Sequence, residues 1–130
     1  MAQKSIEVIL LKQVSDYLAW PVIILDPQCN LIFCNEPAEQ ILGFRFSDTG
    51  ELPESEWISL FIPQDENGQL IESSLLPFKI ALNKLIPVQK SFYLRTIQNK
   101  IKHISACSVP LINQTGFMHG VTTFFQEIEE

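Results

Sequence analysis

Positive charge is scarce in this sequence. Nine lysine and arginine residues stand against 15 aspartate and glutamate residues, so the formal net charge is -6. A chain without excess positive charge cannot displace counterions from a phosphate backbone, so we expect no nucleic-acid partner. A cationic attachment to a membrane surface is disfavoured for the same reason.

Cysteine is also sparse. Cys29, Cys34 and Cys107 form an odd set without a Cys-x-x-Cys pair. A disulfide framework or a structural metal site would need more ligands at regular spacing, so neither is expected. We interpret the three residues as reduced thiols of a cytoplasmic domain, in which they act as small hydrophobic side chains.

Long apolar runs and catalytic signatures are missing as well. The run from Leu18 to Leu25 contains Pro21 and is far too short to span a membrane, so this segment predicts no membrane insertion. The sequence has no nucleophile elbow, no His-Glu-x-x-His, no glycine-rich phosphate loop and no calcium loop. We therefore expect no enzyme in this chain, and any catalytic activity would belong to a separate output domain.

What the sequence does contain is enough apolar material for one folded domain. Its 130 residues are 46% hydrophobic and include nine Phe, two Trp and two Tyr, which excludes a disordered chain. Residues 1–19 are predicted to be an amphipathic helical segment and residues 20–130 the domain proper. Val8 and Leu11 lie off the main apolar stripe of this helix, so it needs two neighbours, and a second protomer is a candidate for one of them. The stripe consists of Ile6, Ile9, Leu10, Val14, Tyr17 and Leu18.

Strand and helix signals follow in a regular order. Residues 22–25 and 31–34 are predicted to be two short strands joined by a turn, and Asn35 is expected to cap a helix that ends at Gly43. Two further helices are expected over residues 54–61 and 77–84. Residues 88–95, 101–111 and 117–128 read as three long strands joined by short turns. The order predicts an α+β domain with one curved antiparallel sheet of five strands.

At this level the sequence resembles the PAS domain family of sensory modules. The stretches that carry the resemblance are V-I-I-L-D-P, L-I-F-C-N-E-P-A-E-Q-I-L-G, L-P-F-K-I-A-L, and S-A-C-S-V-P-L-I-N-Q-T-G with G-V-T-T-F-F-Q-E-I. The resemblance implies a PAS-like five-stranded antiparallel sheet with short helices over one face and an N-terminal amphipathic helix.

The same resemblance implies a space between the sheet and the helices. A ligand in that space would be held mainly by burial of apolar surface. The alternative is that these side chains fill the core themselves. The ligand-binding candidates are Ile23, Leu25, Phe78, Ile80, Leu94, Ile104, Ala106 and Phe125.

No known cofactor is expected from the resemblance. The flavin-binding branch has a cysteine motif after its second-strand helix, whereas this chain has F-R-F-S-D there, with Ile104 and Phe125 where Asn and Gln would read the flavin. Haem-binding members use a His on the helix before the meander, and residues 77–84 have none. His103 should face away from the space, and His119 shares the strand parity of Phe125. An unidentified small apolar ligand remains the expected occupant.

The resemblance also implies a sensory role. We expect a module of a signal transduction protein, such as a two-component system, that relays to an output domain such as a histidine kinase, a cyclase or a transcription regulator. The family's relay signature at the end of the last strand is Asp-Ile-Thr: Ile128 matches it, Glu127 keeps the negative charge, and Glu129 replaces the threonine. The sequence ends at Glu130, where an output helix would begin, so we expect either a piece of a longer receptor or a free-standing regulator. The alternative is a ligand-free PAS module for dimerisation or protein interaction. Candidates for a homodimer interface are Ile6, Ile9, Leu10, Tyr17, Tyr93, Thr122 and Phe124.

Overall fold

The chain folds around one antiparallel sheet. A computed structural model describes residues 6–60 and 62–128. Within them the sheet has six strands in the order β2-β1-β6-β5-β4-β3. The strands are β1 (Val22–Leu25), β2 (Leu31–Cys34), β3 (Ile62–Gln64), β4 (Val88–Arg95), β5 (Ile101–Ile112) and β6 (Met118–Glu127). The helices are α1 (Ile6–Ser15), α2 (Glu36–Leu42), α3 (Phe46–Thr49), α4 (Glu54–Leu60), η1 (Ser73–Leu75) and α5 (Pro77–Lys84).

The three long strands form the meander that the alternating sequence predicts. β4 pairs with β5 along its whole length, and β5 pairs with β6, all antiparallel. The sixth strand is a difference from the predicted sheet of five. In the sequence, Pro63 predicts the end of a helix. In the structure it belongs to β3, at the edge of the sheet, and pairs with Leu94 of β4. Proline is tolerated at such an edge because no further strand needs its missing N–H group.

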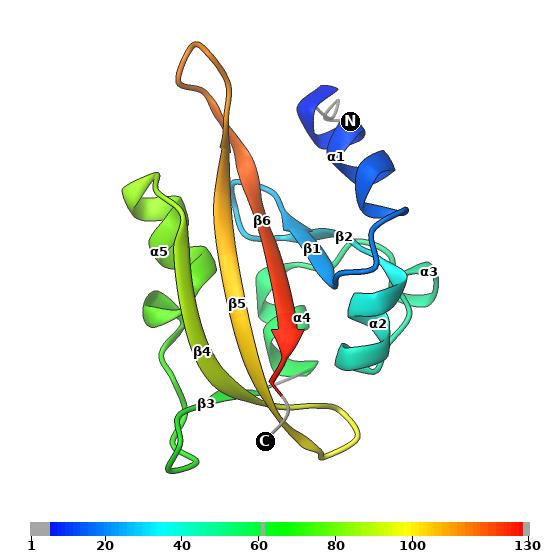
Figure 1. Cartoon of the computed structure of the whole chain (residues 1–130), viewed down its shortest axis with the longest axis vertical. Helices are drawn as coiled ribbons and strands as arrows, with labels where there is room; N and C mark the ends of the chain where they lie inside the picture. Colours follow the sequence, from blue (N-terminus) through cyan, green and yellow to red (C-terminus); the bar gives the residue numbers. More distant parts are fainter. Residues whose placement is uncertain (1–5, 61, 129–130) are drawn as a thin grey trace.

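The two faces of the sheet are covered differently. The short helices α2, α4 and α5 lie over one face, and α1 lies apart from them beside the upper part of β6 (Figure 1). The main core fills the space between the sheet and the short helices and includes Leu25, Trp57 and Phe125. A second, smaller core packs Val8 of α1 against Ile24 on the other face. The predicted α+β class and the one-sided helix layer are therefore confirmed.

Helix α1 is shorter than predicted because a buried side chain takes the carbonyl group that would continue it. The predicted helix runs to Ala19, whereas the observed one ends at Ser15. The carbonyl oxygen of Ser15 accepts hydrogen bonds from Leu18 N and from Asn35 Nδ2. Residues 1–5 of the predicted terminal segment lie outside the described residues.

Asn35 is the polar centre of this region. It is 2% exposed and caps α2, as predicted, because its Oδ1 accepts a hydrogen bond from Ala38 N. The same oxygen accepts from Val22 N at 2.9 Å, at the start of β1. Its Nδ2 donates to the carbonyl oxygens of Ser15 and Trp20. One side chain thus joins the end of α1, the start of β1 and the start of α2.

Candidate functional site

A small cavity lies between the sheet and the helices that cover it. Its volume is about 60 Å³, and its walls come from α2, α4, β3, α5 and four strands of the meander and first hairpin. The lining is apolar except for two hydroxyl groups. It consists of Ile23, Leu42, Trp57, Ile58, Pro63, Leu76, Pro77, Phe78, Phe92, Leu94, Ile104, Ala106, Ser108, Thr123 and Phe125.

Most of the predicted ligand candidates line this cavity. They are Ile23, Phe78, Leu94, Ile104, Ala106 and Phe125. Leu25 is fully buried in the same core but lies outside the lining. Ile80 is a correction, because it is half-buried and belongs neither to the lining nor to the core around it. At about 100° per residue it lies roughly 200° round α5 from Phe78, so it points away from the cavity.

The hydroxyl pair in the cavity is a feature that the sequence analysis missed. Ser108 Oγ and Thr123 Oγ1 are 2.7 Å apart, and the two residues are 0% and 7% exposed. Strand parity could have found them, since Ser108 follows Ile104 and Ala106 at a spacing of two, and Thr123 precedes Phe125 in the same way. Such a buried pair supplies hydrogen-bonding capacity inside an otherwise apolar wall.

The helical side of the cavity is fixed by polar contacts outside it. Trp57 is 2% exposed, donates from Nε1 to the carbonyl oxygen of Cys29 at 2.8 Å and packs edge-on against Phe78. Lys79 Nζ lies 2.9 Å from Glu54 Oε2, so α5 is tied to α4. This contact with Glu54 raises the pKa of Lys79 above its ordinary value.

Cys29 and Cys34 are packed as small apolar side chains in the main core. Burial raises the pKa of the Cys29 thiol, and burial together with the Glu39 carboxylate raises the pKa of Cys34 to about 12. Cys107 is half-buried on β5. All three thiols are free. Among the described residues, no group of three His, Cys, Asp or Glu side chains is placed to hold a metal ion.

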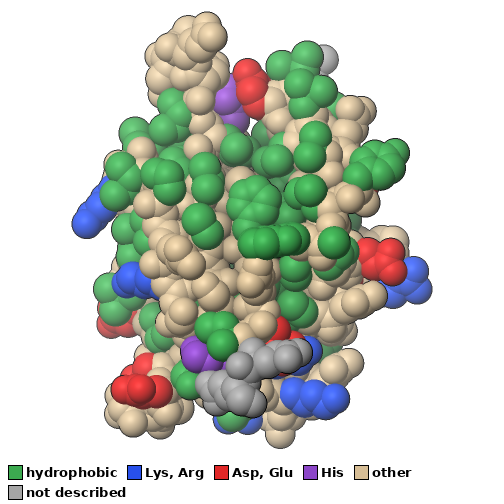
Figure 2. All heavy atoms as spheres, in the orientation of Figure 1, with side chains coloured by type: hydrophobic (Ala, Val, Ile, Leu, Met, Phe, Trp, Pro, Cys, Tyr) green, Lys and Arg blue, Asp and Glu red, His purple; other side chains and the backbone are tan. Residues whose placement is uncertain are grey.

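Helix α1 has a second apolar face that points to solvent. Val8 is 3% exposed, and Leu11 and Leu18 pack in the same small core, whereas the rest of the predicted stripe is exposed. Figure 2 shows apolar side chains gathered across β5, β6 and α1 on this face of the molecule. The exposed apolar residues of the N-terminal segment are Ile6, Ile9, Leu10, Val14, Tyr17 and Trp20.

The predicted interface residues on the sheet are less accessible than those on α1. Tyr93 and Phe124 are half-buried, the first stacked on His103 and the second packed in the core beneath α1. Thr122 is a correction, because it is only 2% exposed and donates from Oγ1 to the carbonyl oxygen of Ile23. A partner chain would not reach Thr122 without displacing its neighbours.

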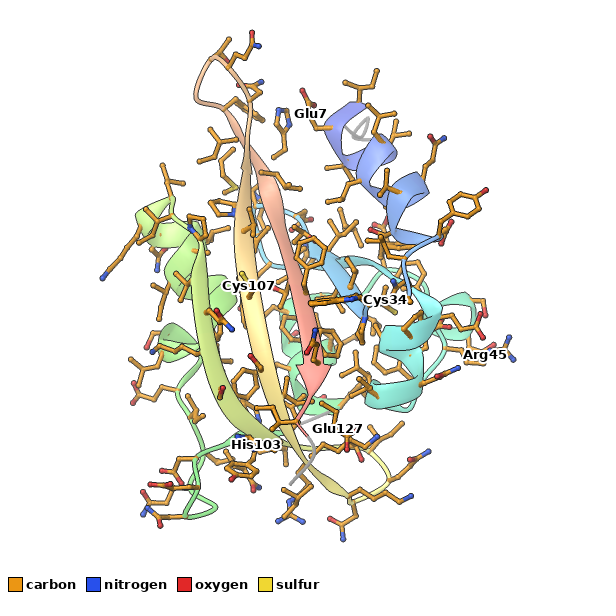
Figure 3. The ribbon with its side chains drawn as sticks, in the orientation of Figure 1. Glu7, Cys34, Arg45, His103, Cys107 and Glu127 are labelled. Atoms are coloured by element: carbon orange, nitrogen blue, oxygen red, sulfur yellow. The ribbon has the colours of Figure 1, made fainter. Side chains whose placement is uncertain are left out.

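The tip of the β5–β6 hairpin contacts α1. His119 Nε2 lies 3.6 Å from Glu7 Oε2 and 3.1 Å from Asn113 Nδ2, and Glu7 faces this hairpin in Figure 3. His119 shares the strand parity of Phe125 in the sequence, but the register of β5 and β6 shifts between Leu111 and Ile112, and its side chain lies against Glu7 of α1.

The end of β6 is held on β5. Ile128 N donates to the carbonyl oxygen of His103 at 2.7 Å, and Glu127 Oε1 lies 3.8 Å from Lys102 Nζ. Figure 3 shows Glu127 and His103 near each other at this end of the sheet. The two predicted relay residues thus form the last described pairing of the chain with the sheet. The helices in the described part of the chain include none that is long and apolar enough to cross a membrane.

Solved structures of the same shape exist, although no family model and no curated protein matches the sequence. The PAS domain of BvgS from Bordetella pertussis is 14% identical, with a TM-score of 0.65 over 95% of this chain and 87% of that one. The PAS domain of the fruit-fly ELK potassium channel is 10% identical, with a TM-score of 0.72 over 93% and 96%. The LOV protein of Rhodobacter sphaeroides is 11% identical, with a TM-score of 0.73 over 96% and 69%. This chain has the PAS fold.

Proposed function

We propose that the chain is a sensory or regulatory PAS module of a signal transduction protein, which binds a small apolar ligand between its sheet and helices. The observation that carries the proposal is the apolar cavity with a hydroxyl pair in its wall, at the place where strands and helices of the fold meet. Occupancy of the cavity would change how the sheet packs on α4 and α5. A ligand can shift such an equilibrium only by its difference in affinity for the two packings.

A ligand-free module for dimerisation or protein interaction is the second candidate. The cavity of about 60 Å³ favours it, because sites for drug-sized molecules usually occupy about 300–1,000 Å³. The exposed stripe on α1 favours it as well. Native mass spectrometry of the freshly purified chain separates the two candidates. A co-purifying small molecule at one per chain supports the sensor, and a bare chain that also binds none of the small apolar compounds offered to it supports the interaction module.

The structural neighbours make flavin a candidate ligand. Several are LOV domains, and one of them was studied with a flavin analogue. Ile104 and Phe125 line the cavity and offer no hydrogen-bonding side chains to a flavin head. The visible absorption spectrum of the purified protein decides the matter, since a bound flavin or haem is coloured.

We further propose that two copies associate through the exposed face of α1 and of the turn that follows it. Ile6, Ile9, Leu10 and Tyr17 are 66%, 44%, 53% and 91% exposed and carry this interface, with the half-buried Tyr93 and Phe124 at its border. Exposed apolar stripes of this kind mark protein contacts more often than scattered apolar residues do. The end of β6 with Glu127 and Ile128 would relay the change to an output domain or partner in the cytoplasm.

The interface has a direct test. Leu10→Glu places a charge in the stripe without disturbing the buried face of α1, so sedimentation should show the dimer dissociating at least about ten-fold more readily. Ile97→Glu is the matched control, because Ile97 is a 47% exposed apolar residue on the β4–β5 turn. An Ile97→Glu effect as large as that of Leu10→Glu, or a wild-type chain that stays monomeric, contradicts the interface.

A further inference from the structure

The two hydroxyl groups in the cavity have two hydrogen-bond donors between them, and the bond that joins them uses only one. A serine or threonine hydroxyl has one donor and two acceptor positions. The bond between Ser108 and Thr123 uses one proton, and among the described residues neither hydroxyl has another hydrogen-bond partner. Both side chains are more than nine-tenths buried and line the cavity. An unmet buried donor is unfavourable, so this wall is suited to an occupant with one hydrogen-bond acceptor.

The rest of the lining excludes a charged occupant. Apart from Ser108 and Thr123, every side chain in the wall is apolar, and the ion pair between Lys79 and Glu54 is outside the lining. A carboxylate or phosphate in the cavity would be buried without a cation, which is strongly unfavourable. The acceptor is therefore an uncharged oxygen, such as that of an alcohol, an aldehyde or a ketone.

The shape of the space favours a narrow occupant. An apolar cavity that binds a benzene ring has a volume of about 150 Å³, and this one is about 60 Å³. A surface groove of about 260 Å³ shares Ile58, Pro63 and Leu76 with the cavity wall and continues over Leu70 and Ile71. Leu70 is 72% exposed, so the groove opens to solvent with an apolar side chain at its edge. A single aliphatic chain is the molecule that suits both spaces.

The hydroxyl pair and the groove lie level with opposite ends of strand β4. Ser108 is opposite Val88 at the start of β4, and Pro63 is opposite Leu94 near its end. Six residues of strand at about 3.3 Å each separate these positions by roughly 20 Å. Figure 1 shows the same arrangement, with α5 beside the upper part of β4 and β3 beside its lower part.

We propose that the ligand is an uncharged aliphatic chain with one oxygen function, whose oxygen bonds to the Ser108–Thr123 pair and whose tail leaves past Pro63 into the groove at Leu70. This inference rests on the proposed function, since it names the class of ligand for the same cavity. It adds the groove as part of the site and the hydroxyl pair as the group that selects for oxygen.

The experiment measures binding of straight-chain primary alcohols from hexanol to hexadecanol to the full chain by calorimetry. Affinity should rise with chain length, and dodecanol should bind about five-fold more tightly than dodecane, the value of one neutral hydrogen bond. The double variant Ser108→Ala/Thr123→Val should lose that preference while keeping its fold, because both partners of the bond are removed together. Equal affinity for dodecanol and dodecane in the wild type, or tighter binding of dodecanoate, overturns the proposal.

The groove is tested with surface variants that leave the core alone. Leu70→Asp should weaken binding of hexadecanol at least about five-fold and leave hexanol unchanged. Leu75→Asp is the matched control, because Leu75 is 54% exposed and lies outside the groove lining. An equal effect of the two variants removes the groove from the site. If none of the alcohols, dodecane or dodecanoate binds at all, the ligand-binding function itself fails rather than its chemistry.

Discussion

The buried amide of Asn35 offers the sharpest prediction about how α1 is attached. Asn35→Ala removes four hydrogen bonds at once, to Val22 N, Ala38 N, Ser15 O and Trp20 O. Ser15 O keeps its bond from Leu18 N, but Val22 N and Ala38 N are left without a partner in fully buried residues. The change therefore acts on α1, β1 and α2 together.

The size of the effect follows from these bonds. Loss of a helix N-cap costs about 1 kcal/mol. Each further buried polar group that loses its partner costs about 1–3 kcal/mol, and partial entry of water lowers the sum. We expect the free energy of unfolding to fall by roughly 3–4 kcal/mol, which is a large part of the stability of a domain of this size.

Urea unfolding of the variant measures this loss. Asn35→Asp is the informative companion, because it keeps the oxygen that caps α2 but turns a carboxylate oxygen toward the carbonyls of Ser15 and Trp20. That repulsion raises the pKa of the new carboxyl in the folded state above its unfolded value of about 3.9. Relative to wild type, Asn35→Asp should therefore recover stability as the pH falls and lose it as the pH rises.

Ser15→Ala is the control for the Asn35 series. Ser15 Oγ is buried and has no hydrogen-bond partner among the described residues, so its removal should be neutral or stabilising by up to about 1 kcal/mol. A loss below about 1 kcal/mol for Asn35→Ala, or a pH-independent difference for Asn35→Asp, would refute the role assigned to this amide.

Two further predictions concern the sheet and its thiols. Gly120→Ala should lower the free energy of unfolding in urea by at least about 3 kcal/mol, because the φ of 147° is strained for other residues and the added Cβ would overlap the carbonyl oxygen of Leu25. The control Gly68→Ala, whose added Cβ would lie in open space, should lower it by only about 1–2 kcal/mol. Equal losses would contradict the close approach of β6 to β1. Cys34, with a pKa of about 12, should be a thiolate at only about one part in 10⁴ at pH 8 and resist alkylation, whereas the half-buried Cys107 reacts first. Since the pKa of Cys34 is raised on folding, its stabilising contribution is present below pH 9 and is lost as the pH rises toward 12, by up to about 1.4 kcal/mol per pH unit. Cys34→Ala should therefore reduce the fall in unfolding free energy at alkaline pH. The same dependence of unfolding free energy on pH in both proteins would contradict the raised pKa.

Alternation of apolar and polar residues made most of the sheet predictable. The long strands pair over their full length, so a period of two placed Leu94, Ile104 and Phe125 on one face, and all three line the cavity. Both ends of α2 were equally predictable, because Asn35 and Gly43 cap the helix through hydrogen bonds and backbone conformations within a few residues of themselves. Local rules suffice where the neighbours in space are also neighbours in sequence.

Long-range contacts account for what the sequence did not reveal. Strand β3 exists because β4 offers an unpaired edge, and nothing near Pro63 in the sequence shows that edge. The place of His119 against Glu7 could not be read from parity, because the register shift between Leu111 and Ile112 has no marker in the alternation. The end of α1 at Ser15 depends on Asn35, which is 20 positions away.

The two-sided character of α1 has a consequence for how the chain can switch. Its Val8 side shields Ile24 and the neighbouring strands, while its Leu10 side stays open. If α1 left its own sheet in a pair of chains, the α1 helix of the other copy could take its place. Nearly the same apolar surface area would be buried in both arrangements. Two arrangements that conserve buried area differ little in free energy, so an input of only a few kcal/mol would suffice to choose between them.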